Sequence, residues 1–206
     1  NQYNSTSVYG DYLSATAIRN ILLSPSPSDA APYLPGGDEL LSAVENHKTA
    51  DLDLYDAVSL YNLRRSSPEQ IGRLYDCAEG LEYALYKQAE TCGTLSETLS
   101  AVKSKRYTFA RLKRIVLQLN LGITKEIMKK AEQSVLPFRV IAIKNDFKPY
   151  LSLISKNAVI RNSDYDKFKN CSFLFDAEKR ASALYATVTR SPDGYYADML
   201  VTDKLI

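Results

Sequence analysis

The chain has 206 residues, of which 45% are hydrophobic and 24% charged, and a formal net charge of +2 at pH 7. This composition is typical of a folded globular domain and excludes a disordered chain, a collagen-like repeat and a long coiled coil. No run of about 20 apolar residues occurs, so a membrane-spanning helix is not predicted. The three cysteines are too scattered for a disulfide framework or a thiolate metal site, and they favour a reducing, cytoplasmic location.

The only histidine, His47, limits the chemistry that this chain can carry out. A zinc hydrolase site, a two-histidine iron site and a paired-histidine nucleotidyl-transfer site all need more than one histidine. No Gly-x-Ser-x-Gly segment is present to build a serine nucleophile around it. We therefore expect His47 in a surface loop, and we predict no metal site in this chain.

The first 63 residues predict short helices separated by a break. Apolar residues between Ser14 and Leu23 fall on one helical face, which indicates a helix there. The segment Ser24-Pro25-Ser26-Pro27-Ser28 interrupts helical structure and is the strongest candidate for a boundary. Helical patterns resume over residues 38–44 and 53–63.

The middle of the chain predicts consecutive helices with clear start signals. Ser67-Pro68-Glu69-Gln70 and Thr94-Leu95-Ser96-Glu97 both match the capping box, in which a hydroxyl and an acid or amide exchange hydrogen bonds with the backbone. Gly122 is suited to ending a helix. The predicted helices cover residues 80–92, 94–103, 108–121 and 124–133.

The period of the pattern changes after residue 137. The β-branched, apolar segment 138–143 predicts a strand, residues 146–155 a helix, and residues 158–161 a second strand. The two strands of such a unit run parallel. A long helix is expected over residues 175–189, and no element is assigned from residue 193 onward. The predicted fold class is therefore mainly α (α+β), multi-helical with a small strand–helix–strand unit.

Charge is distributed unevenly along the chain. Residues 29–102 carry 13 acidic and 5 basic side chains, whereas residues 103–130 carry 9 basic and 1 acidic. On a helix over 108–121, an apolar stripe from Phe109 to Leu119 leaves Arg111, Arg114 and Gln118 together on the opposite side. Outward cations beside an aromatic ring are typical of a surface that follows a nucleic-acid backbone. The predicted RNA contacts are Lys103, Lys105, Arg106, Tyr107, Arg111, Lys113 and Arg114, with Tyr107 as a possible stacking residue.

The basic residues and a nearby group of acidic residues each have a simpler structural explanation. The basic residues can form a solvated helix face that the preceding acidic region balances. Asp76, Glu79 and Glu82 invite a paired-carboxylate interpretation, but acids at a helix N-terminus that favour the helix dipole explain them better.

The segment Ser14-Ala15-Thr16-Ala17-Ile18-Arg19 is a second candidate site. Hydroxyl residues at a helix start, followed by an arginine one turn later, can hold a phosphate. The alternative is an ordinary serine N-cap followed by an exposed arginine.

Three blocks in this order resemble the bacterial tRNA(Met) cytidine acetate ligase family. They are Ser14-Ala15-Thr16-Ala17-Ile18-Arg19, then Leu74-Tyr75-Asp76-Cys77-Ala78-Glu79-Gly80-Leu81-Glu82, then the segment from Lys103 to Arg114. The resemblance covers most of residues 10–190, and Lys105-Arg106-Tyr107-Thr108 is its most specific part. It implies an enzyme that uses ATP to activate acetate as acetyl-adenylate and then acetylates the wobble cytidine of elongator tRNA(Met).

The resemblance also implies a division of labour. The family's nucleotidyltransferase-like α/β domain, with its histidine motif, would be missing here, so that residues 1–24 are its C-terminal remnant. Residues 25–206 would form a helical C-terminal domain that binds tRNA. Ser14, Thr16 and Arg19 would lie on the nucleotide side, no catalytic residue is assigned, and this chain by itself would not form acetyl-adenylate.

Two further functions compete with this interpretation. A non-catalytic RNA-binding module would use the same basic segment, and a helical protein-interaction adaptor would present it to an acidic partner. Salt-dependent binding of tRNA separates the adaptor from the other two.

Overall fold

The computed structural model describes residues 13–34, 36–46, 49–140, 143–154, 156–160 and 162–189. The chain divides into two compact units, Asn1–Ala50 and Asp51–Ile206. The sequence had placed a boundary at residues 24–28 instead, within the first of these units. His47 and the segment from residue 190 lie outside the described residues.

The first unit contains two short helices and a 3₁₀ segment. They are α1 (Ala15–Leu22), η2 (Pro27–Tyr33) and α2 (Gly37–Glu45), and both α-helices pack on η2. Ser14 is the N-cap of α1, and its side-chain oxygen accepts a hydrogen bond from the Ala17 N–H at 3.1 Å. The predicted break after residue 23 is thus a turn into the 3₁₀ segment, which Pro27 begins.

Most of the second unit is helical, and the predicted starts and ends agree closely with it. Both capping boxes form, with Ser67 and Gln70 at the start of α4 and with Thr94 and Glu97 at the start of α6. Gly122 ends α7 in a left-handed conformation. The helices up to residue 132 are α3 (Leu52–Arg65), α4 (Pro68–Gly72), α5 (Leu81–Thr91), α6 (Leu95–Val102), α7 (Phe109–Leu121) and α8 (Lys125–Glu132).

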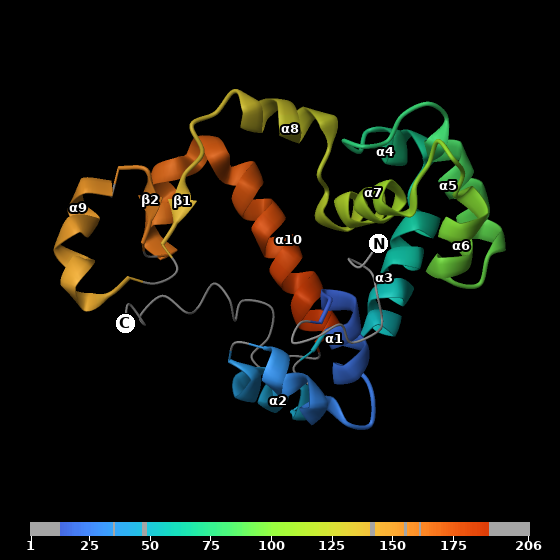
Figure 1. Cartoon of the computed structure of the whole chain (residues 1–206). Coiled ribbons are helices and arrows are strands. Elements are labelled where there is room, and N and C mark those ends of the chain that lie inside the picture. Colours follow the sequence, from blue (N-terminus) through green and yellow to red (C-terminus); the bar gives the residue numbers. More distant parts are fainter. Residues whose placement is uncertain are drawn as a thin grey trace. The chain divides into compact units, whose positions relative to one another are not determined.

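One hydrophobic core joins α3 to α7. Figure 1 draws α3, α5, α6 and α7 close together in teal and green, and α3 packs against α5, α6 and α7. Full burial of one such aliphatic side chain contributes about 1.5–3 kcal/mol. The core residues with no exposed surface are Leu63, Ile71, Cys77, Leu81, Leu85, Ala89, Leu112 and Ile115.

The predicted strand–helix–strand unit forms in a reduced version. The strands β1 (Phe138–Arg139) and β2 (Ala158–Val159) pair in parallel, with Phe138 opposite Ala158. Residues between them form the 3₁₀ segment η3 (Asn145–Tyr150) and the single turn α9 (Leu151–Ile154). The predicted single helix 146–155 is therefore wrong, because Pro149 interrupts α-helical bonding in its centre.

The final described helix is longer than predicted. Helix α10 (Ser172–Val188) follows a 3₁₀ segment, η4 (Asn162–Cys171), that the sequence did not predict. It packs on α7 and α3, where Arg180 Nε donates to the Leu121 carbonyl at 2.6 Å. The Asp51 N–H donates to the Val188 carbonyl at 2.7 Å. These two bonds attach α10 to the end of α7 and to the start of α3.

In the part of the chain that the structure describes, helices dominate and the only sheet has two strands. The prediction of a mainly α fold is thus confirmed. No described helix has both the length and the apolar character that crossing a membrane requires.

Candidate nucleic-acid interface

The turn between α6 and α7 presents the first basic residues. Lys103 caps α6, the Ser104 N–H donates to the Tyr107 carbonyl at 3.1 Å, and the Tyr107 N–H donates to Ser104 Oγ at 3.1 Å. Thr108 then caps α7. This tight turn leaves Lys103, Lys105 and Arg106 exposed.

Asp76 is the point at which one face of α7 meets the loop between α4 and α5. Its carboxylate accepts hydrogen bonds from Arg114 Nε at 3.0 Å and from Gln118 Nε2 at 2.7 Å. Its N–H donates to Gln118 Oε1 at 3.0 Å, and its carbonyl accepts two bonds from the Arg111 guanidinium at 3.0 and 3.2 Å. Side chains of α7 therefore bond to the backbone N–H, the backbone carbonyl and the carboxylate of Asp76.

Glu79 connects the same loop to the turn that precedes α7. It has a positive φ of 66°, which is uncommon for a residue with a side chain. Its carboxylate accepts from Arg106 Nε at 2.7 Å, and its carbonyl accepts from the Tyr107 hydroxyl at 3.0 Å. The half-buried Tyr107 ring packs on the hydrophobic core and lies 5.8 Å from the Arg106 guanidinium and 5.6 Å from that of Arg111.

The predicted contacts therefore fall into three groups. The side chains of Lys103, Lys105 and Lys113 are exposed and make no hydrogen bond or salt bridge with any described residue, and the Lys103 ammonium lies 5.9 Å from the centre of the Phe109 ring. Arg106 and Arg114 are paired with carboxylates, yet 63% and 57% of their side-chain surfaces stay exposed. Arg111 and Tyr107 are half-buried and fasten the loop to the helix. An open cationic surface is present, and its ion pairs lie at the surface rather than inside the molecule.

Two sequence-based interpretations need correction here. Gln118 is not an outward residue, since it is 9% exposed and lies under the loop. Asp76 does not act at a helix N-terminus, because Arg114 and Gln118 bind its carboxylate; Glu79, which directly precedes the N-cap Gly80 of α5, also pairs with Arg106, and Glu82 lies in the first turn. Helical spacing had placed Arg111, Arg114 and Gln118 on one face, but spacing within a helix does not show which loop covers that face.

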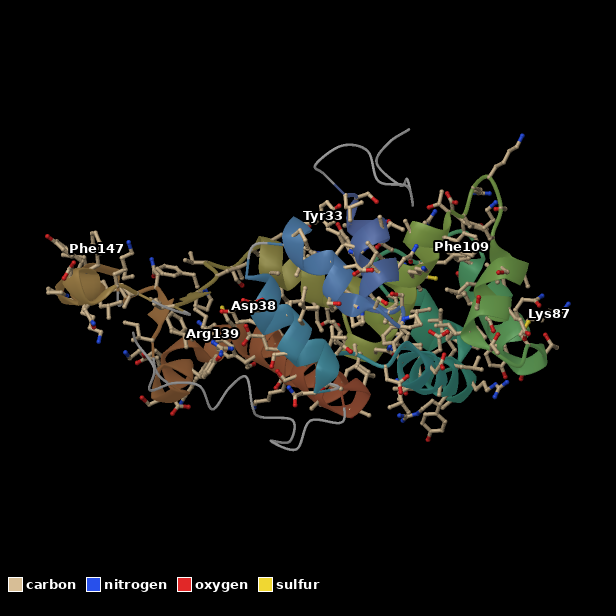
Figure 2. All side chains as sticks on the ribbon, turned by 60° about the horizontal axis from the view of Figure 1, so that its bottom comes forward. Tyr33, Asp38, Lys87, Phe109, Arg139 and Phe147 are labelled. Atoms are coloured by element: carbon tan, nitrogen blue, oxygen red, sulfur yellow. The ribbon has the colours of Figure 1, made fainter. Side chains whose placement is uncertain are left out.

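An apolar groove of about 730 Å³ runs beside the same helix. Phe109, labelled in Figure 2, and Leu117 line it from α7, and Leu99 lines it from α6. Lys113 and Asp56 provide charge on its wall. Burial raises the pKa of Asp56, the neighbouring Asp53 raises it further, and Lys113 opposes both.

The candidate nucleotide-side residues lie at opposite ends of α1. Ser14 is the N-cap and Thr16 lies half-buried in the first turn. Arg19 is exposed and lies in the last turn, where a cation interacts favourably with the helix dipole. The structure thus shows the ordinary cap that was the alternative for Ser14, and phosphate binding by these three residues stays a prediction.

Among the described residues, no group of three histidine, cysteine, aspartate or glutamate side chains is placed to hold a metal ion. The described cysteines are free, and Cys77 and Cys171 are buried.

Curated relatives of this chain are tRNA(Met) cytidine acetate ligases. The enzyme of Thermoanaerobacter sp. (strain X514) is 27% identical over 190 residues, which is 89% of this chain and 47% of the relative. The enzyme of Lactobacillus gasseri is 31% identical over 180 residues, which is 85% of this chain and 46% of the relative. The chain therefore spans about half the length of the curated relatives it matches.

Solved structures of Thermotoga maritima TmcAL have a similar fold. The apo form matches with a TM-score of 0.85 and 22% identity, covering 97% of this chain and 52% of that one. A form bound with alpha-thio ATP matches with a TM-score of 0.79 and 23% identity, covering 91% of this chain and 50% of that one.

A family model described as HIGH Nucleotidyl Transferase matches residues 1–197. The match runs through both compact units, whereas the sequence had predicted a nucleotidyltransferase-like part that is missing apart from residues 1–24. That expectation is wrong, because the region that matches the family is nearly the whole chain. The chain belongs to the HIGH nucleotidyl transferase family.

Proposed function

We propose that this chain belongs to an ATP-dependent enzyme that acetylates a cytidine of tRNA(Met), and that its second unit contributes a tRNA-binding surface. The curated relatives support the reaction through their names, and the Thermotoga maritima neighbour supports ATP through the analogue that it binds. Acetate is the acyl donor that the name of these ligases implies. We also propose a cytoplasmic location, since the three scattered cysteines suit a reducing compartment.

The observation that best supports a tRNA-binding surface is a group of three exposed lysines on one continuous segment of the chain. Lys103, Lys105 and Lys113 are exposed and form no salt bridge with a described residue, although Lys103 lies over the Phe109 ring and Lys113 interacts electrostatically with Asp56. Arg106 and Arg114 add guanidinium groups that keep more than half of their side-chain surface exposed. Phosphate contacts from such cations release counterions, and about 4–6 contacts give a log–log slope of about −3 to −5 against salt concentration.

A second part of the proposal concerns the nucleotide and involves three residues. Ser14, Thr16 and Arg19 belong to the first unit, and we propose that they face the nucleotide. The exposed guanidinium of Arg19 is the group best suited to a phosphate.

The test removes only the three open lysines, because the arginines also hold the loop. In the variant Lys103→Ala/Lys105→Ala/Lys113→Ala, we expect tRNA binding to weaken at least about tenfold at low salt. The slope against salt should become shallower by about 2–3, since each lost contact removes about 0.7–0.9. Filter binding of tRNA(Met) at several salt concentrations measures both.

A matched control is Lys144→Ala/Lys148→Ala/Lys156→Ala, which removes the same charge from the strand–helix–strand region. Binding by the control should stay within about twofold of the wild-type value. An equal loss in both variants would mean that only net charge matters, and no loss in the first variant would reject this surface.

A further inference from the structure

A short β-bridge joins the loop after α4 to the connection between α7 and α8. Leu74 and Thr124 form an antiparallel bridge, with the Lys125 N–H donating to the Arg73 carbonyl at 2.9 Å and the Tyr75 N–H donating to the Ile123 carbonyl at 3.3 Å. Leu74 is buried, 2% exposed, while Arg73, Tyr75 and Lys125 are exposed.

Tyr75 combines a fixed backbone with an open ring. Its own N–H is bonded to Ile123, and the next residue, Asp76, is held by Arg111 and Gln118. The Tyr75 side chain is 44% exposed and has no hydrogen bond or ring contact within the described residues. Tyr107, by contrast, uses its hydroxyl on Glu79 and its ring on the core, so it is less available to a ligand.

Two exposed cations, Arg73 and Lys125, lie close to Tyr75 in this pairing, and the carboxylates of Glu69 and Glu126 interact with Arg73. Arg73 and Lys125 are joined through their backbones, and both side chains are exposed. Lys125 Nζ donates to the Gly72 carbonyl at 2.7 Å, which holds the ammonium near this side of the loop. The nearby Glu126 is engaged by Lys130 at 2.9 Å. Arg114 approaches from α7 through its pair with Asp76, the neighbour of Tyr75.

We propose that Tyr75 stacks on an unpaired RNA base while Arg73 and Lys125 hold the adjacent phosphates. An exposed ring on a backbone held by hydrogen bonds, with exposed cations on nearby residues, is the combination that binds single-stranded nucleotides. The inference rests on the proposed function, and it names the part of the RNA that this surface takes: an unpaired nucleotide, not a duplex. It moves the stacking role from Tyr107 to Tyr75.

The test compares three single variants in tRNA binding. Tyr75→Ala should weaken binding about 5- to 100-fold, since it removes the stacked ring. Tyr75→Phe keeps the ring and should stay within about twofold of wild type. Tyr83→Ala is the matched control, because Tyr83 is a 62% exposed tyrosine on α5 with no cation in ring contact among the described residues, and it should also bind as wild type.

Salt and a second RNA separate stacking from charge. Tyr75→Ala should leave the salt slope unchanged, whereas Arg73→Ala/Lys125→Ala should make it shallower by about 1.4–1.8. A blunt RNA duplex without unpaired nucleotides should bind wild type and Tyr75→Ala alike.

The outcomes distinguish the two proposals. If the wild-type chain shows no salt-dependent binding of tRNA, the proposed function fails. If wild type binds tRNA but Tyr75→Ala binds equally well, or loses the duplex to the same extent, the stacking role of Tyr75 is overturned. Thermal unfolding of each variant, with an unchanged midpoint expected, shows that a loss of binding is not a loss of fold.

Discussion

Individual cations of the basic segment differ in how much of the fold they support. Arg111 gives two hydrogen bonds to the Asp76 carbonyl, and Gln118 donates to the carboxylate and accepts from the N–H of the same residue. Removing a partner from such a buried network costs about 1–3 kcal/mol, whereas an exposed ion pair contributes about 0–1 kcal/mol. Loss of RNA binding in an Arg111 variant would therefore be ambiguous, while Lys105 and Lys113, which do not bind the loop, report on RNA binding more directly.

Cys77, beside Asp76, predicts a specific dependence of stability on pH. Burial and, secondarily, the carboxylate of Glu82 raise the pKa of its thiol from 9.0 to about 11, against the opposing Lys125 and Arg111. Below pH 9 the thiol is protonated in both the folded and the unfolded chain, so it has no effect. Between pH 9 and about 11 only the unfolded chain loses the proton, so the free energy of unfolding should fall by up to about 1.4 kcal/mol per pH unit.

Urea denaturation of wild type and Cys77→Ala from pH 7 to 10.5 measures this effect. The variant starts less stable because of the cavity, but its stability should decline less steeply above pH 9. Cys92→Ala, at the C-cap of α5, serves as the control and should follow the wild-type curve. Parallel curves for wild type and Cys77→Ala would show that the buried thiol does not titrate as described.

At the scale of elements, Gly122 and Gly80 form a matched pair. Both have positive φ, 67° and 80°, but a Cβ on Gly122 would lie 3.2 Å from the Arg180 guanidinium carbon, whereas a Cβ on Gly80 would meet nothing within 4 Å. Gly80→Ala should cost about 1 kcal/mol of stability from backbone conformation alone. Gly122→Ala should cost more, because Arg180 must also move from the Leu121 carbonyl that it binds.

Chemical denaturation of both variants, alone and combined with Arg180→Ala, checks this argument. In the Arg180→Ala background the two glycine substitutions should cost nearly the same. If Gly122→Ala stays more costly there, the extra cost does not come from the contact with Arg180.

Elements with local start and stop signals could be predicted from the sequence. The helix expected over 108–121 is observed at Phe109–Leu121, and the one over 94–103 at Leu95–Val102, because capping hydroxyls and Gly122 mark their ends. The segments η3 and η4 were not predicted, since short 3₁₀ turns have no comparable signal.

The candidate surface could be predicted only in part, for the same reason. Exposure of Lys103, Lys105 and Lys113 follows from the period of the apolar stripe on α7 and from the short turn before it. The attachment of Tyr107 and Arg111 does not, because their partners Glu79 and Asp76 lie about 30 residues earlier in the chain. Helix periodicity identifies the buried stripe but contains no information about tertiary contacts on the other faces.

At the scale of the whole molecule, the uneven charge of the sequence has a structural counterpart. The acidic region before residue 102 and the basic segment after it meet in the pairs Glu79–Arg106 and Asp76–Arg114. The balanced-face alternative thus describes two of the cations. It does not describe Lys103, Lys105 and Lys113, which are exposed and form no salt bridge with a described residue.

The division into two units predicts that residues 51–206 fold and bind RNA without residues 1–50. All members of the main hydrophobic core lie between Leu60 and Val116, and the bond from Asp51 to Val188 stays within the second unit. A chain of residues 51–206 should therefore unfold in one cooperative transition. Its free energy of unfolding should lie within about 1 kcal/mol of that of the same unit in the whole chain, because no core side chain is lost. Its tRNA affinity and salt slope should match those of the whole chain, since every proposed contact is retained. Urea denaturation followed by circular dichroism, together with filter binding, measures both, and a truncated chain that folds but binds with a shallower slope would place RNA contacts in the first unit.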